Sequence, residues 1–138
     1  MTSVVAEMPV RVYYEDTDHG GGVYYANYLR FFERGRTELL RSLGFEQDEL
    51  AGKQGILFVV RRVEVDYLRP AVFNDLLRVV TEVAELGRAR VDFDQAVYRQ
   101  DEHRPLCQGR VSVACVEAGT FRPARIPEGI RQALGFGN

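Results

Sequence analysis

The sequence predicts an α+β fold in which one long helix packs on a five-stranded antiparallel sheet. A β-rich segment near the N-terminus is followed by a stretch whose apolar residues recur at helical spacing. Four more β-rich segments follow, and the short polar links between them are typical of antiparallel neighbours. Packing one amphipathic helix on one antiparallel sheet is the simplest way to bury both apolar surfaces. The pattern does not indicate whether the sheet wraps the helix.

Length, composition and charge indicate a single globular domain over residues 1–138. The chain has 46% hydrophobic and 28% charged residues, a balance that supports a buried core. Its formal net charge of −2 argues against a protein that binds nucleic acid or a membrane surface. The N-terminus has no basic start and no long apolar run. We therefore expect no signal peptide, no membrane insertion and a cytoplasmic location.

The first predicted strand covers residues 10–14, and the polar, glycine-rich residues 15–22 predict a loop. The helix is expected to begin near Asn27, a residue type that caps helices, and to end at Gly44. Gly35 in its middle costs about 1 kcal/mol of helix propensity, so we expect the helix to approach the sheet closely there. Apolar residues recur at helical spacing at Leu29, Phe32, Leu39, Leu40 and Leu43, and Gly35 and Arg36 lie on the same face.

A polar connection over residues 46–55 leads to the rest of the sheet. We predict strands at residues 57–68, 76–83, 90–99 and 106–116. Hairpin links are expected at residues 85–88 and 101–105, and a short helix in the C-terminal tail. Side chains alternate between the two faces of a strand. In the strand at residues 57–68, this alternation places a set of apolar side chains on one face, namely Leu57, Val59, Val63, Val65 and Tyr67. Cys107 and Cys115 lie too far apart to bond and are expected to pack as small core hydrophobes.

The segment most suggestive of chemistry places carboxylates and three glycines directly before the predicted helix. The first turn of a helix has free N–H groups and partial positive charge, which can stabilise an oxyanion formed from a carbonyl. A nearby aspartate such as Asp18 is ionised at neutral pH and can act as a base or nucleophile. These features suit hydrolysis of an activated acyl group. Acidic loops before helices also commonly cap the helix and remain solvated, so the pattern alone leaves both interpretations open.

Residues 14–28 read YEDTDHGGGVYYANY and are followed by LRFFE, and this segment resembles the signature of the 4-hydroxybenzoyl-CoA thioesterase family. The similarity is closest to the YbgC-type acyl-CoA thioesterases associated with the Tol-Pal cell-envelope system. It continues through VVR at 59–61, VDYLRPA at 65–71, NDLL at 74–77 and ACV at 114–116. The resemblance implies a hotdog fold, in which a five-stranded antiparallel sheet wraps a long central helix. It also implies a homodimer or homotetramer with active sites at the dimer interface.

By the same resemblance, the family's catalytic aspartate corresponds to Asp18, acting as nucleophile or general base toward the thioester carbonyl. The backbone N–H that polarises this carbonyl corresponds to Tyr25, a position that is commonly histidine in YbgC-type members. The change removes an imidazole but keeps the backbone N–H. Glu33 corresponds to a position near the acyl pocket, and Arg88 and Arg90 to a basic segment that holds the CoA nucleotide. Exposed helical and strand-end charges are the alternative interpretation for these three residues.

The expected activity is hydrolysis of an acyl-CoA thioester to a free acid and CoA. No metal or redox cofactor is implied, because CoA arrives as part of the substrate. The alternative is a hotdog protein that binds acyl-CoA or acyl-carrier protein without turnover, which the missing histidine keeps open and Asp18 argues against. A third interpretation is an interaction module of the cell-envelope machinery. Asp16 is expected to be structural, accepting N–H bonds within its loop.

Overall fold

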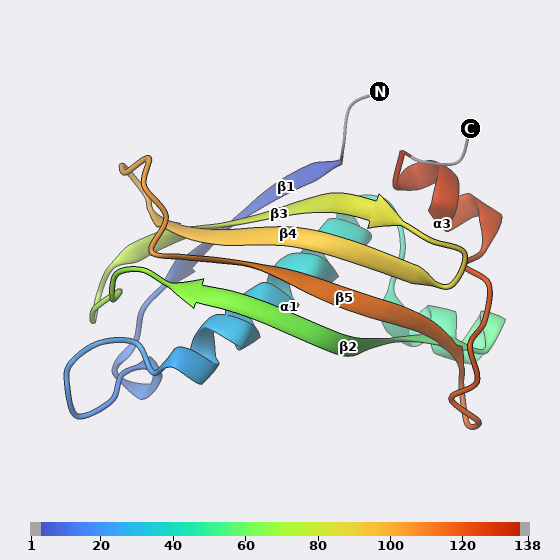
Figure 1. Cartoon of the computed structure of the whole chain (residues 1–138), viewed down its shortest axis with the longest axis horizontal. Coiled ribbons are helices and arrows are strands. Elements are labelled where there is room, and N and C mark those ends of the chain that lie inside the picture. The colour runs from blue at the N-terminus through green and yellow to red at the C-terminus, as the bar shows by residue number, and fades with distance from the viewer. Residues whose placement is uncertain (1–3, 136–138) are drawn as a thin grey trace.

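A computed structural model describes residues 4–135, which form one antiparallel sheet with a long helix, α1 (Tyr25–Ser42), across one face (Figure 1). The strand order is β1-β3-β4-β5-β2, and all neighbours are antiparallel. The strands are β1 (Val5–Arg11), β2 (Ile56–Tyr67), β3 (Leu76–Leu86), β4 (Arg90–Arg99) and β5 (Cys107–Glu117). The predicted class, one long helix on a five-stranded antiparallel sheet, is therefore confirmed.

The first strand lies earlier in the chain than the sequence predicted. β1 covers Val5–Arg11, and the end of the predicted strand instead begins a single turn of 3-10 helix, Tyr14–Asp16. Pro9 lies inside β1, and a proline normally argues against a strand. β1 is an edge strand, and the backbone groups that bond toward β3 belong to even-numbered residues such as Val4 and Val12. Pro9 therefore needs no N–H and does not interrupt the pairing.

Helix α1 begins two residues before the predicted cap and ends as predicted. Its first residue is Tyr25, and Asn27 lies in the first turn, where it is buried. The Asn27 amide donates to Asp16 Oδ1 at 3.0 Å, so this side chain holds the preceding loop and does not cap the helix. Gly44 follows the helix with a φ of 94°, a left-handed conformation that glycine adopts without strain.

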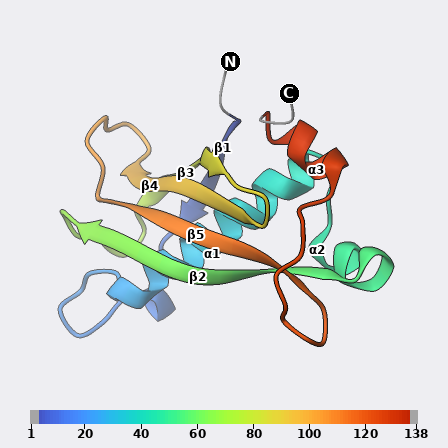
Figure 2. The ribbon, with the colours of Figure 1, turned by 45° about the vertical axis from the view of Figure 1, so that its right-hand side comes forward.

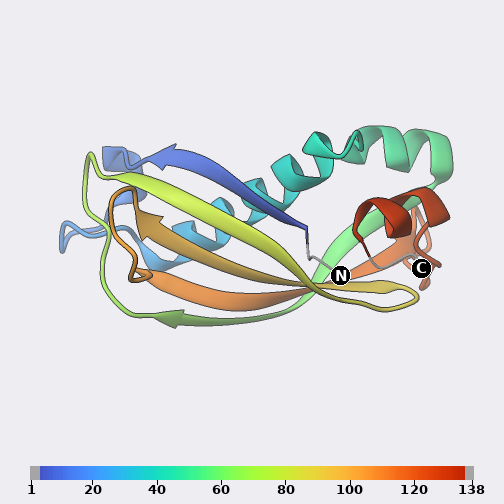
Figure 3. The same cartoon turned by 90° about the horizontal axis from the view of Figure 1, so that it is seen from above.

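Helix α1 lies close to the sheet at Gly35, as the sequence predicted. A Cβ added to Gly35 would lie 2.5 Å from Thr81 Oγ1 and 3.1 Å from Gln95 Nε2. Gln95 joins the helix to the sheet, because its amide donates to the Phe32 carbonyl and to Thr81 Oγ1, each at 2.8 Å. Figure 3 shows α1 running along one side of the curved strands. The core lies between the helix and this face.

The apolar face predicted for β2 is wrong in its first half. The register between β2 and β5 shifts between Val60 and Arg62, which makes Arg61 the extra residue of a β-bulge. One extra residue moves the side chains before it to the opposite face of the sheet. Beyond the bulge, Tyr67 faces α1 as predicted and contacts its tyrosines. Before the bulge, the side chains that face α1 are Phe58 and Val60, in place of Leu57 and Val59.

Residues 46–55, predicted as a polar connection, form two short helical segments. These are α2 (Gln47–Glu49) and η2 (Leu50–Gln54). Leu50 alone anchors this segment in the core, and one apolar residue among polar ones is too little for a helical periodicity. The short helix predicted in the tail is confirmed as α3 (Glu128–Ala133), which lies at the same end of the molecule as α2 (Figure 2).

The two cysteines belong to the core, as predicted. Cys107 and Cys115 are free thiols on β5, and both side chains are fully buried. Burial raises the pKa of Cys107 to about 12 and that of Cys115 to about 11. The thiolate is the reactive form of cysteine. These thiols therefore act as packing groups.

Candidate active site

The loop before α1 is fixed to the helix by Asp16. Asp16 Oδ2 accepts the Tyr13 N–H at 2.8 Å, and Oδ1 accepts the Asn27 amide at 3.0 Å. The Asp16 carbonyl also accepts the Tyr24 N–H at 2.8 Å. Both ends of the loop are therefore tied to one residue. The structural role predicted for Asp16 is confirmed.

Asp18 begins a tight hairpin at the tip of this loop. Thr17 and Val23 pair as an antiparallel bridge, and the Asp18 N–H donates to the Gly22 carbonyl at 2.9 Å. The Asp18 carboxylate accepts the Gly20 N–H through Oδ1 at 2.9 Å. Its other oxygen, Oδ2, makes no hydrogen bond to any of residues 4–135, and the side chain is exposed in the single chain. One oxygen thus orients the carboxylate and the other is open to a ligand.

The first turn of α1 has an open positive end. Tyr24, the N-cap residue, makes no capping hydrogen bond, and the first turn contains no acidic side chain. Within the described part of the chain, the Tyr25 N–H has no hydrogen-bond acceptor. A hydrogen bond with Tyr25 raises the pKa of the Tyr24 hydroxyl, and the negative charge of Asp18 raises it further. The loop that holds Asp18 runs directly into this helix end, which favours developing negative charge.

Aromatic side chains beside the helix start remain exposed in the single chain. The ring of Tyr67, at the end of β2, lies 6.0 Å from the ring of Tyr25 and 5.6 Å from that of Tyr28, centroid to centroid. Tyr25 is 60% exposed and Tyr67 46% exposed. Tyr28 is buried, and its hydroxyl accepts the Ala71 N–H at 3.0 Å. The site is therefore open on the side of the β2 edge.

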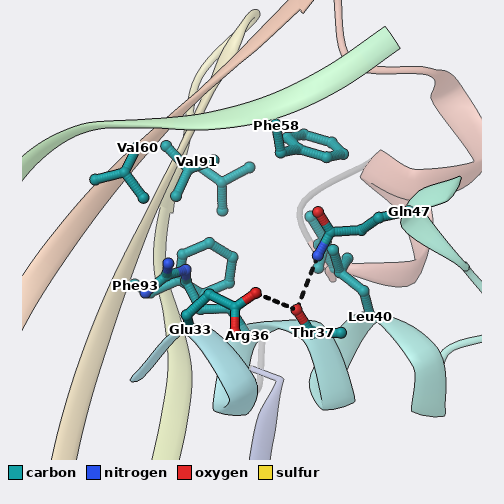
Figure 4. Close-up of a pocket in the computed structure, with 11 residues that line it drawn as sticks. Glu33, Arg36, Thr37, Leu40, Gln47, Phe58, Val60, Val91 and Phe93 are labelled. Carbon is teal, nitrogen blue, oxygen red and sulfur yellow. Dashed lines mark hydrogen bonds between the residues drawn. The ribbon is translucent and has the colours of Figure 1, made fainter. Parts of the chain in front are cut away.

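A cavity of about 130 Å³ lies further along α1, between the helix and the sheet (Figure 4). Glu33 lies at its rim, where the Thr37 hydroxyl donates to Glu33 Oε1 at 3.5 Å. The Gln47 amide donates to Thr37 Oγ1 at 3.0 Å. Phe58 and Val60 line the opposite wall from β2. The structure thus places Glu33 at a pocket, and Asp18 lies outside that pocket.

Arg88 lies in the turn between β3 and β4, at the end of the sheet opposite the start of α1 (Figure 1). Its exposed side chain lines a shallow depression together with Arg125 and Arg131. Arg131 donates to the Gly87 carbonyl at 2.8 Å, which holds α3 against this turn. Three guanidinium groups therefore gather here, and a single chain does not bring them to Asp18.

Arg90 has different surroundings from Arg88. It lies on the sheet face away from α1, 3.3 Å from Asp92 Oδ1 and 3.5 Å from Glu85 Oε2. The Asp92 contact is an ion pair without hydrogen-bond geometry. Two carboxylates therefore offset the charge of Arg90, and the structure does not bring it together with Arg88 in one site.

A profile of the Thioesterase-like superfamily matches residues 12–134. The chain belongs to this superfamily. It is 47% identical to the acyl-CoA thioesterase YbgC of Haemophilus influenzae, over 91% of each chain. It is 39% identical to the acyl-CoA thioester hydrolase YbgC of Escherichia coli, over 94% of this chain and 96% of that one. A solved probable thioesterase from Bartonella henselae has a TM-score of 0.84 at 38% identity, with 89% of this chain and 99% of that one covered. The family resemblance and the hotdog fold predicted from the sequence are confirmed.

Two further observations concern residues 4–135. No three histidine, cysteine, aspartate or glutamate side chains in this range are close enough to hold a metal ion. No helix in it combines the length and apolar character needed to cross a bilayer.

Arg36 is a charged residue of the pocket in this thioesterase-family chain that was not predicted as such from the sequence. Arg36 lines the cavity, although only 9% of its surface is exposed. Its guanidinium donates to Gln95 Oε1 at 3.0 Å. The signal was present in the sequence, because Arg36 falls on the apolar face of the helix between Phe32 and Leu39. A charged residue on such a face either has a polar partner in the core or faces a cavity.

Proposed function

We propose that this protein hydrolyses acyl-CoA thioesters to a free acid and CoA. The observation that carries the proposal is the free Tyr25 N–H at the positive end of α1, next to a loop that presents the Asp18 carboxylate. The similarity to relatives named acyl-CoA thioesterases supports the same substrate class. A cytoplasmic location belongs to this proposal.

The chemistry follows from the charges at the helix start. The thioester carbonyl accepts the Tyr25 N–H, so that the negative charge formed on its oxygen lies at the end of the α1 dipole. Asp18 then adds to the carbonyl carbon directly, or removes a proton from the water that adds to it. In the first case the carbon–sulfur bond breaks to leave an anhydride between Asp18 and the acyl group, and water then hydrolyses this anhydride to the free acid and the Asp18 carboxylate. In the second case the water oxygen joins the acyl carbon, and the carbon–sulfur bond breaks to give the free acid. In both cases CoA leaves as the thiolate and takes a proton at sulfur. CoA enters as part of the substrate, and no other cofactor takes part.

The proposal includes a second copy of the chain. An edge strand with exposed apolar side chains is a surface that proteins normally cover. On β2, Val60 is 49% exposed and Val63 39% exposed, and Tyr67 continues this surface to the exposed Tyr25 of α1. Pairing of two β2 edges across a two-fold axis would bury this surface and would close the open side of the Asp18 loop. We therefore infer a homodimer.

The dimer also gives Arg88 a role. β2 runs from the end of the sheet near Arg88 to the end near the α1 start (Figure 1). Antiparallel pairing of two β2 strands places the Arg88 end of one copy beside the Asp18 end of the other. The guanidinium groups of Arg88, Arg125 and Arg131 can then hold the nucleotide phosphates of a CoA bound in the site of the second copy.

Release of free thiol from a panel of acyl-CoAs tests the proposal. Asp18→Asn should lower kcat by at least about 100-fold, because it removes the group that attacks or activates water. Asp48→Asn, an exposed carboxylate on α2, is the matched control and should leave the rate unchanged. Binding of acyl-CoA by the wild type without thiol release would support the non-catalytic alternative. Equal thiol release by wild type and Asp18→Asn would remove the mechanism.

A further inference from the structure

The cavity beside Glu33 has an apolar wall from the sheet and a second wall from helix α1 that combines Leu40 with polar side chains. The sheet contributes apolar side chains, including Phe58 and Val60 from β2 and Phe93 from β4. Helix α1 contributes the polar side chains of Arg36 and Thr37 (Figure 4). A purely hydrocarbon ligand would pack well against the wall from the sheet. It would also separate the polar side chains of the α1 wall from water. Polar groups left without a partner in such a pocket weaken binding.

A purely hydrocarbon ligand would leave N–H donors of Arg36 without a hydrogen-bond acceptor. A guanidinium has five N–H donors, and the hydrogen bond found for Arg36 within residues 4–135 is the one to Gln95 Oε1 at 3.0 Å. No carboxylate of these residues lies within 4.0 Å of it, so it has no ion-pair partner. Burial lowers the pKa of Arg36, and the charge of Glu33 opposes this effect in part. Arg36 is nevertheless among the residues that line the cavity, although only 9% of its surface is exposed.

The position of the Arg36 guanidinium is fixed by the core. Gln95, its partner, is 2% exposed and is itself held by the Phe32 carbonyl and by Thr81, each at 2.8 Å. The donors that remain on Arg36 are therefore held in place before any ligand arrives. A preorganised donor at the end of a pocket selects ligands that bring an acceptor to that point.

The cavity lies within reach of an acyl group bound at the start of α1. Glu33 follows Tyr25 by eight residues, which is about 12 Å along the helix axis. An extended chain covers about 3.5 Å for every three bonds, so about ten bonds span this distance. The route is apolar, because Leu29 of α1 and Val63 of β2 are exposed between the Tyr25–Tyr67 contact and the cavity.

We propose that this cavity binds the far end of the acyl chain and selects chains of about ten carbons that carry an oxygen acceptor there, on a hydroxyl or a carboxylate. The inference rests on the proposed thioesterase activity and defines its substrate class. The Arg36 guanidinium donates to the terminal oxygen, and the apolar wall contacts the carbons before it. Arg36 is thus a specificity residue distant from the reacting carbonyl.

A matched set of thioesters tests the inference. Thiol release is measured with decanoyl-CoA, ω-hydroxydecanoyl-CoA, the mono-CoA thioester of sebacic acid, and butyryl-CoA, whose chain is too short to reach the cavity. We expect kcat/KM for at least one terminally oxygenated substrate to exceed that for decanoyl-CoA by about ten-fold or more, the effect of a hydrogen bond to a charged group. Comparison of the two oxygenated substrates distinguishes a hydroxyl from a carboxylate.

Arg36→Met removes the guanidinium and keeps an unbranched apolar side chain. It should reduce the preference for the oxygenated substrate to about one-fold, measured as the ratio of kcat/KM for that substrate to kcat/KM for decanoyl-CoA. Arg30→Met, an exposed arginine on the same helix, should keep the wild-type preference. If Arg36→Met does not fold, the inference is tested by the wild type alone, through the ratio of kcat/KM for the oxygenated substrates to kcat/KM for decanoyl-CoA. Equal kcat/KM for decanoyl-CoA and both oxygenated substrates would overturn this inference and leave the proposed function standing. Thiol release from none of the four substrates would overturn both.

Discussion

Replacing Gly35 with alanine tests whether close packing of α1 on the sheet holds the molecule together. The new Cβ would lie 2.5 Å from Thr81 Oγ1, 3.1 Å from Gln95 Nε2 and 3.2 Å from Val79 Cγ1. None of the three neighbours is a flexible surface group, because Thr81 and Val79 are 0% exposed and Gln95 is 2% exposed. The helix or the sheet must therefore move.

The magnitude follows from two opposing effects. Alanine in place of glycine stabilises a helix interior by about 1 kcal/mol. Overpacking a close-packed core costs about 1–3 kcal/mol. Displacing Gln95 also weakens its bonds to Phe32 and Thr81, each worth about 1 kcal/mol. The variant should therefore be less stable than the wild type by about 2 kcal/mol, which lowers the Tm by roughly 8 °C for a chain of this size.

The assay is thermal and urea denaturation followed by circular dichroism, with protein concentration held constant because a dimer's Tm depends on it. Gly129→Ala is the matched control, since Gly129 lies in helix α3 and an added Cβ meets no atom within 4 Å. The control should be as stable as the wild type, or more stable by up to about 1 kcal/mol. A Gly35→Ala protein with a Tm equal to or above that of the wild type would refute the close-approach reasoning.

Three further predictions concern the core and the proposed dimer. Cys107 and Cys115, with pKa values raised to about 12 and about 11, should react with a thiol reagent near neutral pH only as fast as the protein unfolds; rapid labelling of the folded protein would contradict this. Burial raises the pKa of the Tyr28 hydroxyl. The free energy by which the protonated hydroxyl stabilises the fold is therefore fully present below about pH 10 and is lost as the pH rises through the folded-state pKa. Tyr28→Phe should cost about 1–3 kcal/mol at neutral pH by leaving a backbone N–H unpaired, and its stability in urea should fall less steeply above pH 10 than that of the wild type. Val63→Glu on the β2 edge should give monomers in analytical ultracentrifugation, whereas Val5→Glu on the β1 edge should not; a Val63→Glu dimer would place the interface elsewhere.

Several elements of the fold could be predicted because their residues repeat a simple pattern. The helix face through Phe32, Leu39 and Leu40 has a helical period, and a glycine ends it, so α1 was predicted with its C-terminal end correct. The bulge at Arg61 could not be predicted, since one extra residue changes the side-chain alternation without changing the composition of the strand. The early start of β1 could not be predicted from the sequence, since Pro9 is compatible with a strand only at a sheet edge, and edge position is a tertiary property.

The candidate site could be predicted in part from residue types before a helix. The loop with Asp18 and the helix start at Tyr25 are consecutive in sequence, so their proximity follows from local structure. The cavity at Glu33 and Arg36 could not be predicted by local pattern, because its opposite wall comes from strands that are distant in sequence. The position of Arg88 relative to Asp18 could not be predicted by local pattern either, because the β3–β4 turn and the start of α1 lie at opposite ends of the sheet.

The central claim is that Asp18 acts on the thioester and does not merely help to bind it. The direct test measures binding and hydrolysis separately in the wild type and in Asp18→Asn. Binding is measured by calorimetry with a non-hydrolysable thioether analogue of butyryl-CoA, and hydrolysis by thiol release from butyryl-CoA. We predict nearly equal Kd values and a kcat lower by at least about 100-fold in the variant. An unchanged kcat, or a loss of activity fully explained by weaker binding, would contradict the claim.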